Sequence, residues 1–190
     1  MVSASYGKNI VAICNDKGKT IWTYKTKGKQ KGHNGHHDVH LLPNGNILFH
    51  DIWSHLLEIN LKGETVWEYE AAKQNRKGPV HIHAFARLAN GDTMIVESGI
   101  GRIIHVDPQG KLVKEFPLKK EAKNTRWARM TDEGHYVMAS EDYGIVEYGS
   151  NEKIVWEFDN FELVGNGLAC WETLEGEKAA LVRSKLAELK

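Results

Sequence analysis

The sequence has no excess of charge of either sign, because 25 lysines and arginines balance 25 aspartates and glutamates over 190 residues. A neutral chain has no overall field that would attract nucleic acid or an anionic membrane surface. No apolar run approaches the roughly 18 residues of a membrane span, so the sequence predicts no transmembrane helix. The opening residues lack the charged and apolar regions of a secretory signal, and they leave the compartment open.

Cysteine is scarce as well. Cys14 and Cys170 are the two in the sequence, and neither lies in a C-x-x-C, haem-attachment or zinc-binding spacing. Cys14 falls in an apolar run, where we expect it to fill core space rather than to react. The sequence firmly implies no cofactor, and the cofactor is left unknown.

What the sequence does contain is a unit of about 45 residues that occurs four times. Its marker is G-K-T-I-W, G-E-T-V-W, G-K-L-V-K or E-K-I-V-W, and the copies end at Trp22, Trp67, Lys114 and Trp156. The copies are 45, 47 and 42 residues apart, which is typical of a four-stranded propeller blade. We therefore expect an all-β propeller of four blade-equivalents.

One unit shows how the blade is built. A run from His36 to Leu42 meets the turn Pro43-Asn44-Gly45, in which asparagine and glycine take positive φ at low cost. Three further strands are predicted after it, at Asn46–Asp51, His55–Ile59 and Thr65–Glu70. The marker tryptophans then fall on the outermost strand, where large aromatics can pack between blades. Lys114 interrupts the set, so one junction should pack differently.

The marker is similar to the tryptophan-docking repeat of pyrroloquinoline-quinone-type propellers, since Asn15, Asn60 or Asp107 precedes its glycine by three residues. The segments H-H-D-V-H-L-L-P-N-G-N-I-L and L-L-E-I-N-L-K-G-E-T-V-W-E-Y also resemble bacterial arylsulfotransferase-type propellers. The resemblance covers roughly residues 2–165. It implies the propeller architecture and a periplasmic or secreted location, and it does not imply an activity.

The repeats predict how the ring closes. Val2–Tyr6 aligns with the second strand at Met94–Ser98, and Gly167–Leu174 aligns with an innermost strand. Three closures stay open: four blades within one chain, two chains exchanging strands into an eight-bladed ring, or a piece of a larger propeller. The expected divisions are a propeller domain over 1–176 with blades near 36–70, 81–118 and 126–158, a closing blade from 167–174 plus 2–25, and a tail at 177–190.

The tail is predicted to be helical. Ala179, Val182, Leu186 and Leu189 recur at spacings of three and four among strong helix formers, which gives an amphipathic stripe. We expect this helix to pack on the ring or to contact another subunit.

Propellers bind ligands where their inner strands and inter-blade loops gather. The aligned inner strands put His37, His83, Arg126 and Ala169 at one level, followed by a level with Val39, Phe85, Ala128 and Trp171 and a third with Leu41, Arg87, Met130 and Thr173. The predicted ligand-binding residues are His37, His83, Phe85, Arg87, Arg126 and Trp171.

The loops beside that mouth are basic in three cases and acidic in the fourth. A patch of positive charge would attract an anion, although an ordinary solvated surface explains the same charges. The basic residues are Lys25, Lys27, Lys29 and Lys31 in the first loop, Lys73, Arg76 and Lys77 in the second, and Lys119, Lys120 and Lys123 in the third; Asp159 and Glu162 make the fourth acidic.

Three interpretations of the histidines compete. His36, His37, His81 and His83 could bind a metal, with Asp38 in support. Alternatively, His37 or His83 could take a sulfuryl or phosphoryl group while Arg126 holds its oxygens. The third interpretation, which we favour, is a non-enzymatic binding module whose axial mouth recognises a small anionic molecule or a partner loop, as a monomer or a strand-exchanged homodimer. Four further histidines are expected to be structural: His50, His55, His105 and His135.

Overall fold

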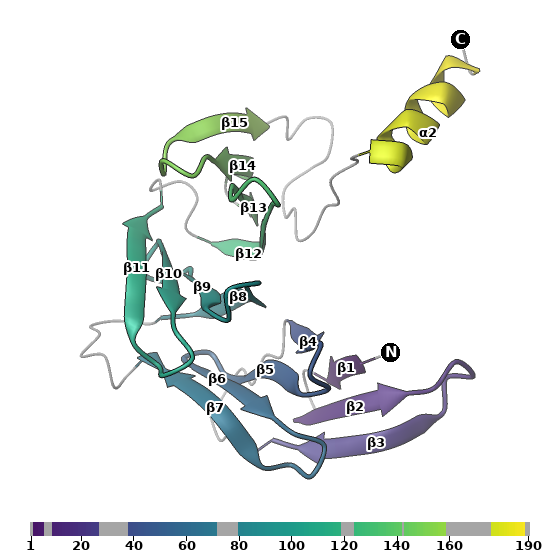
Figure 1. The fold of residues 1–190 in the computed structure, drawn as a ribbon, viewed down its shortest axis with the longest axis vertical. Helices are drawn as coiled ribbons and strands as arrows, with labels where there is room; N and C mark the ends of the chain where they lie inside the picture. Colours follow the sequence, from purple (N-terminus) through teal and green to yellow (C-terminus); the bar gives the residue numbers. More distant parts are fainter. Residues whose placement is uncertain are drawn as a thin grey trace.

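The computed structural model describes residues 2–5, 9–26, 38–71, 80–118, 124–141, 143–158 and 176–188. In this part of the chain fifteen strands form four antiparallel sheets, and one helix follows them. The sheets succeed one another as propeller blades along an open arc, with the first and fourth blades at its two ends (Figure 1). The predicted all-β propeller of four blade-equivalents with a C-terminal helix is confirmed.

The strands of each blade pair in sequence order, from the inner to the outer edge. The first blade contains β1 (Val2–Ser5), β2 (Ile10–Cys14) and β3 (Thr20–Lys25). The second contains β4 (Val39–Leu41), β5 (Ile47–Ile52), β6 (His55–Ile59) and β7 (Thr65–Glu70). The third contains β8 (Ile82–Arg87), β9 (Thr93–Glu97), β10 (Arg102–Val106) and β11 (Leu112–Pro117). The fourth contains β12 (Thr125–Met130), β13 (Tyr136–Ser140), β14 (Gly144–Tyr148) and β15 (Ile154–Phe158).

The first blade has three strands in the part of the chain that the structure describes. Its β1 pairs with β2 in the register of β9 with β10, since Val2 lies opposite Ile13 as Met94 lies opposite His105. β1 thus takes the position of a second strand, in agreement with the aligned repeats. The inner strand predicted for this blade, Gly167–Leu174, lies outside the described residues.

A side-chain cap shapes the turn between the third and fourth strands. The Asn60 side-chain oxygen accepts hydrogen bonds from the backbone N–H groups of Lys62, at 2.9 Å, and Glu64, at 3.1 Å. Asn15 and Asp107 accept the same pair of bonds in the first and third blades. Such turns favour asparagine and aspartate, which explains why the repeat carries one of them three residues before its glycine.

The hydrophobic core is divided among the junctions between blades. The junction of the first two blades buries Val11, Phe49 and Ile59, with Trp22 and Tyr24 packed against them. Comparable clusters lie between the second and third blades and between the third and fourth. Because neighbouring blades cover both of their faces, β9 and β10 of the third blade are buried along their whole length.

Two marker tryptophans pack as predicted. Trp22 donates through Nε1 to the carbonyl oxygen of Leu61 at 2.9 Å, and Trp67 donates to that of Asp107 at 3.4 Å. In each case the tryptophan reaches the turn of the next blade. Trp156 differs because it is 48% exposed, and no later blade covers it among the described residues.

The junction of the third and fourth blades packs differently, as Lys114 predicts. Lys114 donates through Nζ to the Tyr136 hydroxyl at 3.2 Å, and its ammonium group lies over the rings of Phe116 and Tyr136. The Tyr136 hydroxyl also contacts Nε2 of His105 at 3.0 Å. A large aromatic from the receiving blade therefore fills space at this junction, in place of one from the donating blade.

The tail forms the helix α2 (Gly176–Ala187), as predicted. Glu177 in its first turn and Lys185 in its last complement the helix dipole. Ala179 is buried, but Leu186 is 56% exposed, so the predicted apolar stripe is only partly covered.

Candidate functional site

The inner strands β4, β8 and β12 lie on the inner side of the arc (Figure 1). Their last residues, Leu41, Arg87 and Met130, are equivalent, since each pairs with the first residue of the following strand. The level predicted from the aligned repeats therefore corresponds to the observed register. One residue earlier in each strand, the equivalent positions hold His40, Ala86 and Arg129.

The structure brings together two of the residues predicted at the axial mouth. Arg126 donates through Nη1 to Nε2 of His83 at 2.8 Å, and its Nε lies 2.9 Å from a carboxylate oxygen of Glu141. Both residues sit at irregularities of the ladder near the start of β8 and β12. The third predicted member of this level, His37, lies outside the described residues.

This pairing limits the chemistry of His83. A guanidinium has no acceptor, so Nε2 must present its lone pair to Arg126. The residue is also only 2% exposed. A group that attacked from Nε2 would first have to displace Arg126, and this geometry does not favour sulfuryl transfer at His83.

Two residues close to His83 in the sequence contribute packing. Phe85 is fully buried, and its ring lies 5.1 Å from that of His40 and 5.9 Å from that of His50. His81 takes a positive φ of 47° and packs edge-on against Trp53, with ring centroids 4.3 Å apart. Burial, together with the charge of Arg126, lowers the pKa of His81.

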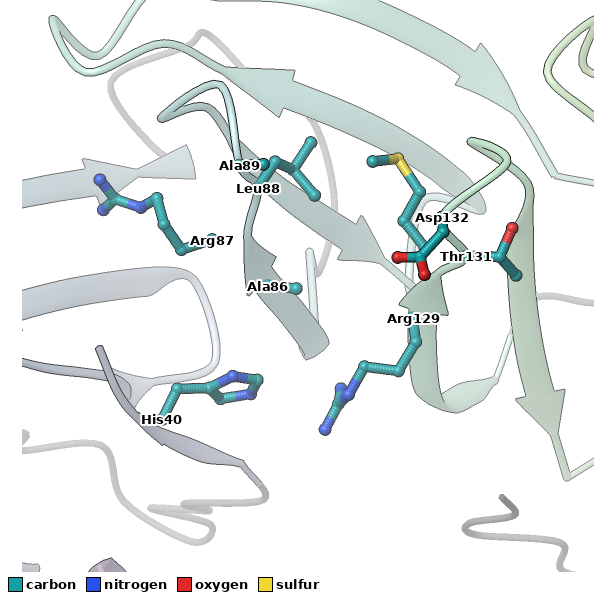
Figure 2. Close-up of a pocket in the computed structure, with 9 residues that line it drawn as sticks. His40, Ala86, Arg87, Leu88, Ala89, Arg129, Thr131 and Asp132 are labelled. Carbon is teal, nitrogen blue, oxygen red and sulfur yellow. The ribbon is translucent and has the colours of Figure 1, made fainter. Parts of the chain in front are cut away.

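A pocket of about 420 Å³ opens at the other end of the inner strands. Strands rise about 3.3 Å per residue, so Arg87 lies roughly 13 Å along β8 from His83. Figure 2 shows the pocket between the second, third and fourth blades. It is lined by His40, Ala86, Arg87, Leu88, Ala89, Arg129, Met130, Thr131 and Asp132.

One side of the pocket is formed by residues from two non-adjacent blades. Arg129 of the fourth blade lies 3.3 Å from a carboxylate oxygen of Asp38 in the second, and His40 lies 2.9 Å from the same carboxylate. At the equivalent position of the third blade the pocket is lined by Ala86, whose small side chain adds little bulk there. Burial opposes ionisation of Asp38, but the hydrogen bond and charge of His40 and the charge of Arg129 outweigh it and lower its pKa.

Arg129 is oriented by its surroundings, and some of its N–H groups make no hydrogen bond to a described residue. Its guanidinium stacks over the ring of Trp127 at 4.9 Å, and its Nη1 makes both of its hydrogen bonds, to Asp38 and to the Ala128 carbonyl oxygen. Among the described residues, Nε and Nη2 have no acceptor. Two adjacent N–H groups of this kind match the two oxygens of a carboxylate, phosphate or sulfate.

Arg87 is held more tightly. Its Nη2 donates to Glu58 at 2.7 Å, and its guanidinium stacks over Trp67 at 5.1 Å. Glu58 also accepts from the side-chain amides of Asn44 and Asn46, at 3.2 and 2.7 Å. In Figure 2 the guanidinium of Arg87 points away from Arg129. Arg87 thus lines the pocket, but it is engaged in the blade junction.

Sequence reasoning missed two residues that line this pocket, His40 and Arg129, and the contact that both make with Asp38. The repeat alignment contained their signal, because His40 and Arg129 are equivalent residues with alanine between them. Of the predicted site, His36, His37, Ala169, Trp171 and Thr173 lie outside the described residues, as do all the basic-loop residues except Lys25.

In the ranges that the structure describes, no three histidine, cysteine or acidic side chains are grouped so that they could hold a metal ion. His81 and His83, two of the four predicted ligands, have ring centroids 6.0 Å apart. The described part of the chain also contains no helix that is long and apolar enough to cross a bilayer.

The blades, their docked tryptophans and the capped turns define a β-propeller protein of the pyrroloquinoline-quinone-like repeat class. Within that class, the chain belongs to the family described as outer membrane protein assembly factor BamB, which matches residues 1–169. No protein of curated function matches it in sequence.

Solved structures of propeller fold are similar to this chain. A protein of unknown function from Bacteroides caccae has a TM-score of 0.67 at 18% identity, over 83% of this chain and 57% of its own. A streptogramin B lyase has a TM-score of 0.64 at 13% identity, over 80% and 49%, and virginiamycin B lyase from Staphylococcus aureus one of 0.62 at 16%, over 83% and 54%. The chain thus spans about half of the length of these structures, and the likeness concerns the fold alone.

Proposed function

We propose that this chain is a binding module of a β-propeller, and that its axial pocket accepts an anionic group carried by a small molecule or a partner loop. The observation that carries the proposal is Arg129, which lines a pocket of about 420 Å³ with two N–H groups that no described residue uses. A carboxylate, phosphate or sulfate would accept both. The contact between Arg129 and Asp38 is long, at 3.3 Å, so a ligand anion could replace Asp38 as the partner of Arg129.

The family supports a partner. Its description names an outer membrane protein assembly factor. We extend to this chain, as part of the proposal, a role in binding another protein and the periplasmic location that the sequence resemblance implies. An acidic side chain on a partner loop would present the same chemistry to Arg129 as a small carboxylate.

Calorimetric titration with sulfate, phosphate and N-acetylglutamate tests the pocket. Hydrogen bonds to charged groups contribute about 1.5–3 kcal/mol, so Arg129→Gln should weaken the binding of a responsive probe by roughly ten- to a hundredfold. Arg183→Gln, the same change on the exposed surface of α2, is the control and should leave binding unchanged. The proposal fails if no probe binds, or if both variants bind as the unaltered protein does.

Sulfuryl transfer by His37 or His83 remains the alternative. An assay with an aromatic sulfate donor addresses it directly. Turnover that is present in the unaltered protein and lost in both His37→Ala and His83→Ala would replace the binding proposal.

A further inference from the structure

The outer face of the fourth blade repeats a docking surface that is occupied elsewhere in the molecule. In the first blade Trp22 and Tyr24 stack with ring centroids 6.4 Å apart and ring planes 9° apart. In the fourth blade Trp156 and Phe158 stack with the same separation and an angle of 13°. The two aromatic pairs thus present nearly the same shape.

The pair in the first blade is seated on the second. Trp22 donates to the Leu61 carbonyl oxygen at 2.9 Å, while Tyr24 packs edge-on against Phe49, with ring centroids 5.9 Å apart. The Tyr24 ring also lies against the turn at Gly63, where an added Cβ would come within 3.3 Å of it. Docking therefore partly covers the pair with one turn and one middle strand of the receiving blade.

Among the residues that the structure describes, the pair in the fourth blade has no such seat. Trp156 is 48% exposed, whereas Trp67, its equivalent at a docked junction, is 9% exposed. A tryptophan with about half of its surface in water, on a position that is covered in other blades, marks an unfilled protein interface.

The matching seat is present on the first blade. Its turn at Asn15 is capped like the turn at Asn60, and Gly18 takes a φ of 74°, close to the 80° of Gly63. Among the described residues nothing lies within 4 Å of the position that a Cβ on Gly18 would occupy. By equivalence, the carbonyl oxygen of Asp16 stands where that of Leu61 receives Trp22.

The two halves of this interface lie at opposite ends of the arc, so they do not meet within the described chain (Figure 1). The solved propellers described above extend well beyond this arc, since the chain covers 57%, 49% and 54% of them. A ring of this kind needs blades in addition to those of one arc, and a second copy would supply them. A head-to-tail interface closes into a ring when the rotation per copy allows it.

We propose that the fourth blade docks on the first blade of a second copy of this chain, twice, so that two copies close one propeller ring. Trp156 of each copy donates to the Asn15–Gly18 turn of the other, as Trp22 does to the second blade. The proposal does not depend on what the axial pocket binds.

The mass in solution is the first test. Light scattering across a range of concentrations should give twice the 21.5 kDa of one chain. Trp156→Glu should reduce it to one chain, because a charge in place of the anchor cannot be buried at the junction. The matched control is Val113→Glu, since Val113 is 50% exposed on the outer strand of a blade that is already docked. This control should keep the doubled mass.

A labelling experiment reports on the seat itself. Cys14 is equivalent to Ile59, which is fully buried in the cluster that holds Trp22. In a Cys170→Ser background, maleimide should label Cys14 slowly in the assembled protein and at least tenfold faster when Trp156→Glu is added. Val113→Glu should label as slowly as the background.

The outcomes separate the alternatives. If the protein is a monomer and Cys14 is labelled rapidly, the seat on the first blade is empty. If it is a monomer in which Cys14 is labelled slowly, and Trp156→Glu makes this labelling fast, the ring closes within one chain. A larger polymer means that the interface does not close. Each of these results overturns the two-copy ring, and none of them bears on anion binding at Arg129.

Discussion

Arg126 of β12 donates to His83 of β8 at 2.8 Å, and this bond joins the inner strands of two blades at equivalent positions of the repeat. The imidazole is 2% exposed, while the side chain of Arg126 is 28% exposed and also pairs with Glu141. The charged partner thus reaches solvent, and the neutral partner is held inside. Such an arrangement stabilises the junction between the blades without burying a whole ion pair.

Removing the arginine should weaken that junction. Arg126→Met leaves a nearly buried imidazole without its charged donor, and we expect the free energy of unfolding in urea to fall by about 1–3 kcal/mol. Arg183→Met, on the exposed surface of α2, should change it by less than about 0.5 kcal/mol. Equal losses in the two variants would show that the His83 contact contributes nothing.

Arg102 has one buried and one exposed partner, which allows a matched comparison. Glu97 is fully buried and pairs with Arg102 and, at 2.6 Å, with the Tyr69 hydroxyl, whereas the side chain of Glu115 is 44% exposed. Glu97→Gln should cost about 3–5 kcal/mol of unfolding free energy, because it leaves a buried cation poorly compensated. Glu115→Gln should cost about 0–1 kcal/mol. Similar losses would contradict this assignment.

Restoring the interrupted tryptophan should not stabilise the protein. Tyr136 already fills the junction beneath Lys114, so Lys114→Trp should overpack it and cost about 1–3 kcal/mol. The third blade, on which Trp67 docks, has the buried Thr93 at the position equivalent to Tyr136. Tyr136→Thr copies that residue into the fourth blade. The double variant should therefore lose less unfolding free energy than the two single variants lose together. Strict additivity in a double-mutant cycle would refute this coupling.

Two histidines should give opposite dependences on pH. Burial opposes protonation of His55, but its hydrogen bonds to Asp51 and Glu68 and their charges outweigh burial and raise its pKa. Burial and the charge of Lys114 lower the pKa of His105. His55 therefore stabilises the fold most below its unfolded pKa of about 6.5, and this stabilisation is lost as the pH rises through its raised folded pKa. His105 stabilises the fold above about 6.5, and its contribution falls as the pH falls.

The same substitution at both positions tests these signs. The loss of unfolding free energy caused by His55→Gln should be larger at about pH 5 than at about pH 8, where less of the wild-type imidazole is protonated. For His105→Gln the loss should be smaller at about pH 5, because the fold opposes protonation of the wild-type ring and the unfolded chain does not. Urea unfolding at the two pH values measures the loss in each variant. If both losses changed with pH in the same direction, the opposite pKa shifts would be excluded.

The blade architecture could be predicted because its signals are local. Asn15 and Asn60 cap turns within a few residues of themselves, and the spacing of Trp22 and Trp67 counts whole blades. Even the unusual packing at Lys114 follows from one departure in the repeat. These features need only the neighbouring blade, which the repeat itself supplies.

The pocket could not be read from the sequence in the same way. Asp38 and Arg129 are 91 residues apart and belong to blades that are not neighbours, so no repeat unit contains their contact. The residue at the equivalent position of the intervening third blade is the small Ala86. Strand alternation faces Phe85 inward, so the sequence predicts it to be a ligand-binding residue. In the structure, close packing at the junction buries it completely.

The division of the core among junctions has a consequence for how the molecule comes apart. The second and third blades are each held on two sides, whereas the first and fourth blades of a single arc are held on one. In chains stabilised by nearest-neighbour contacts, opening begins at the ends and proceeds inward. Amide hydrogens of β2 and β14 should then exchange before those of β6 and β10, and a capped end would exchange more slowly than a bare one.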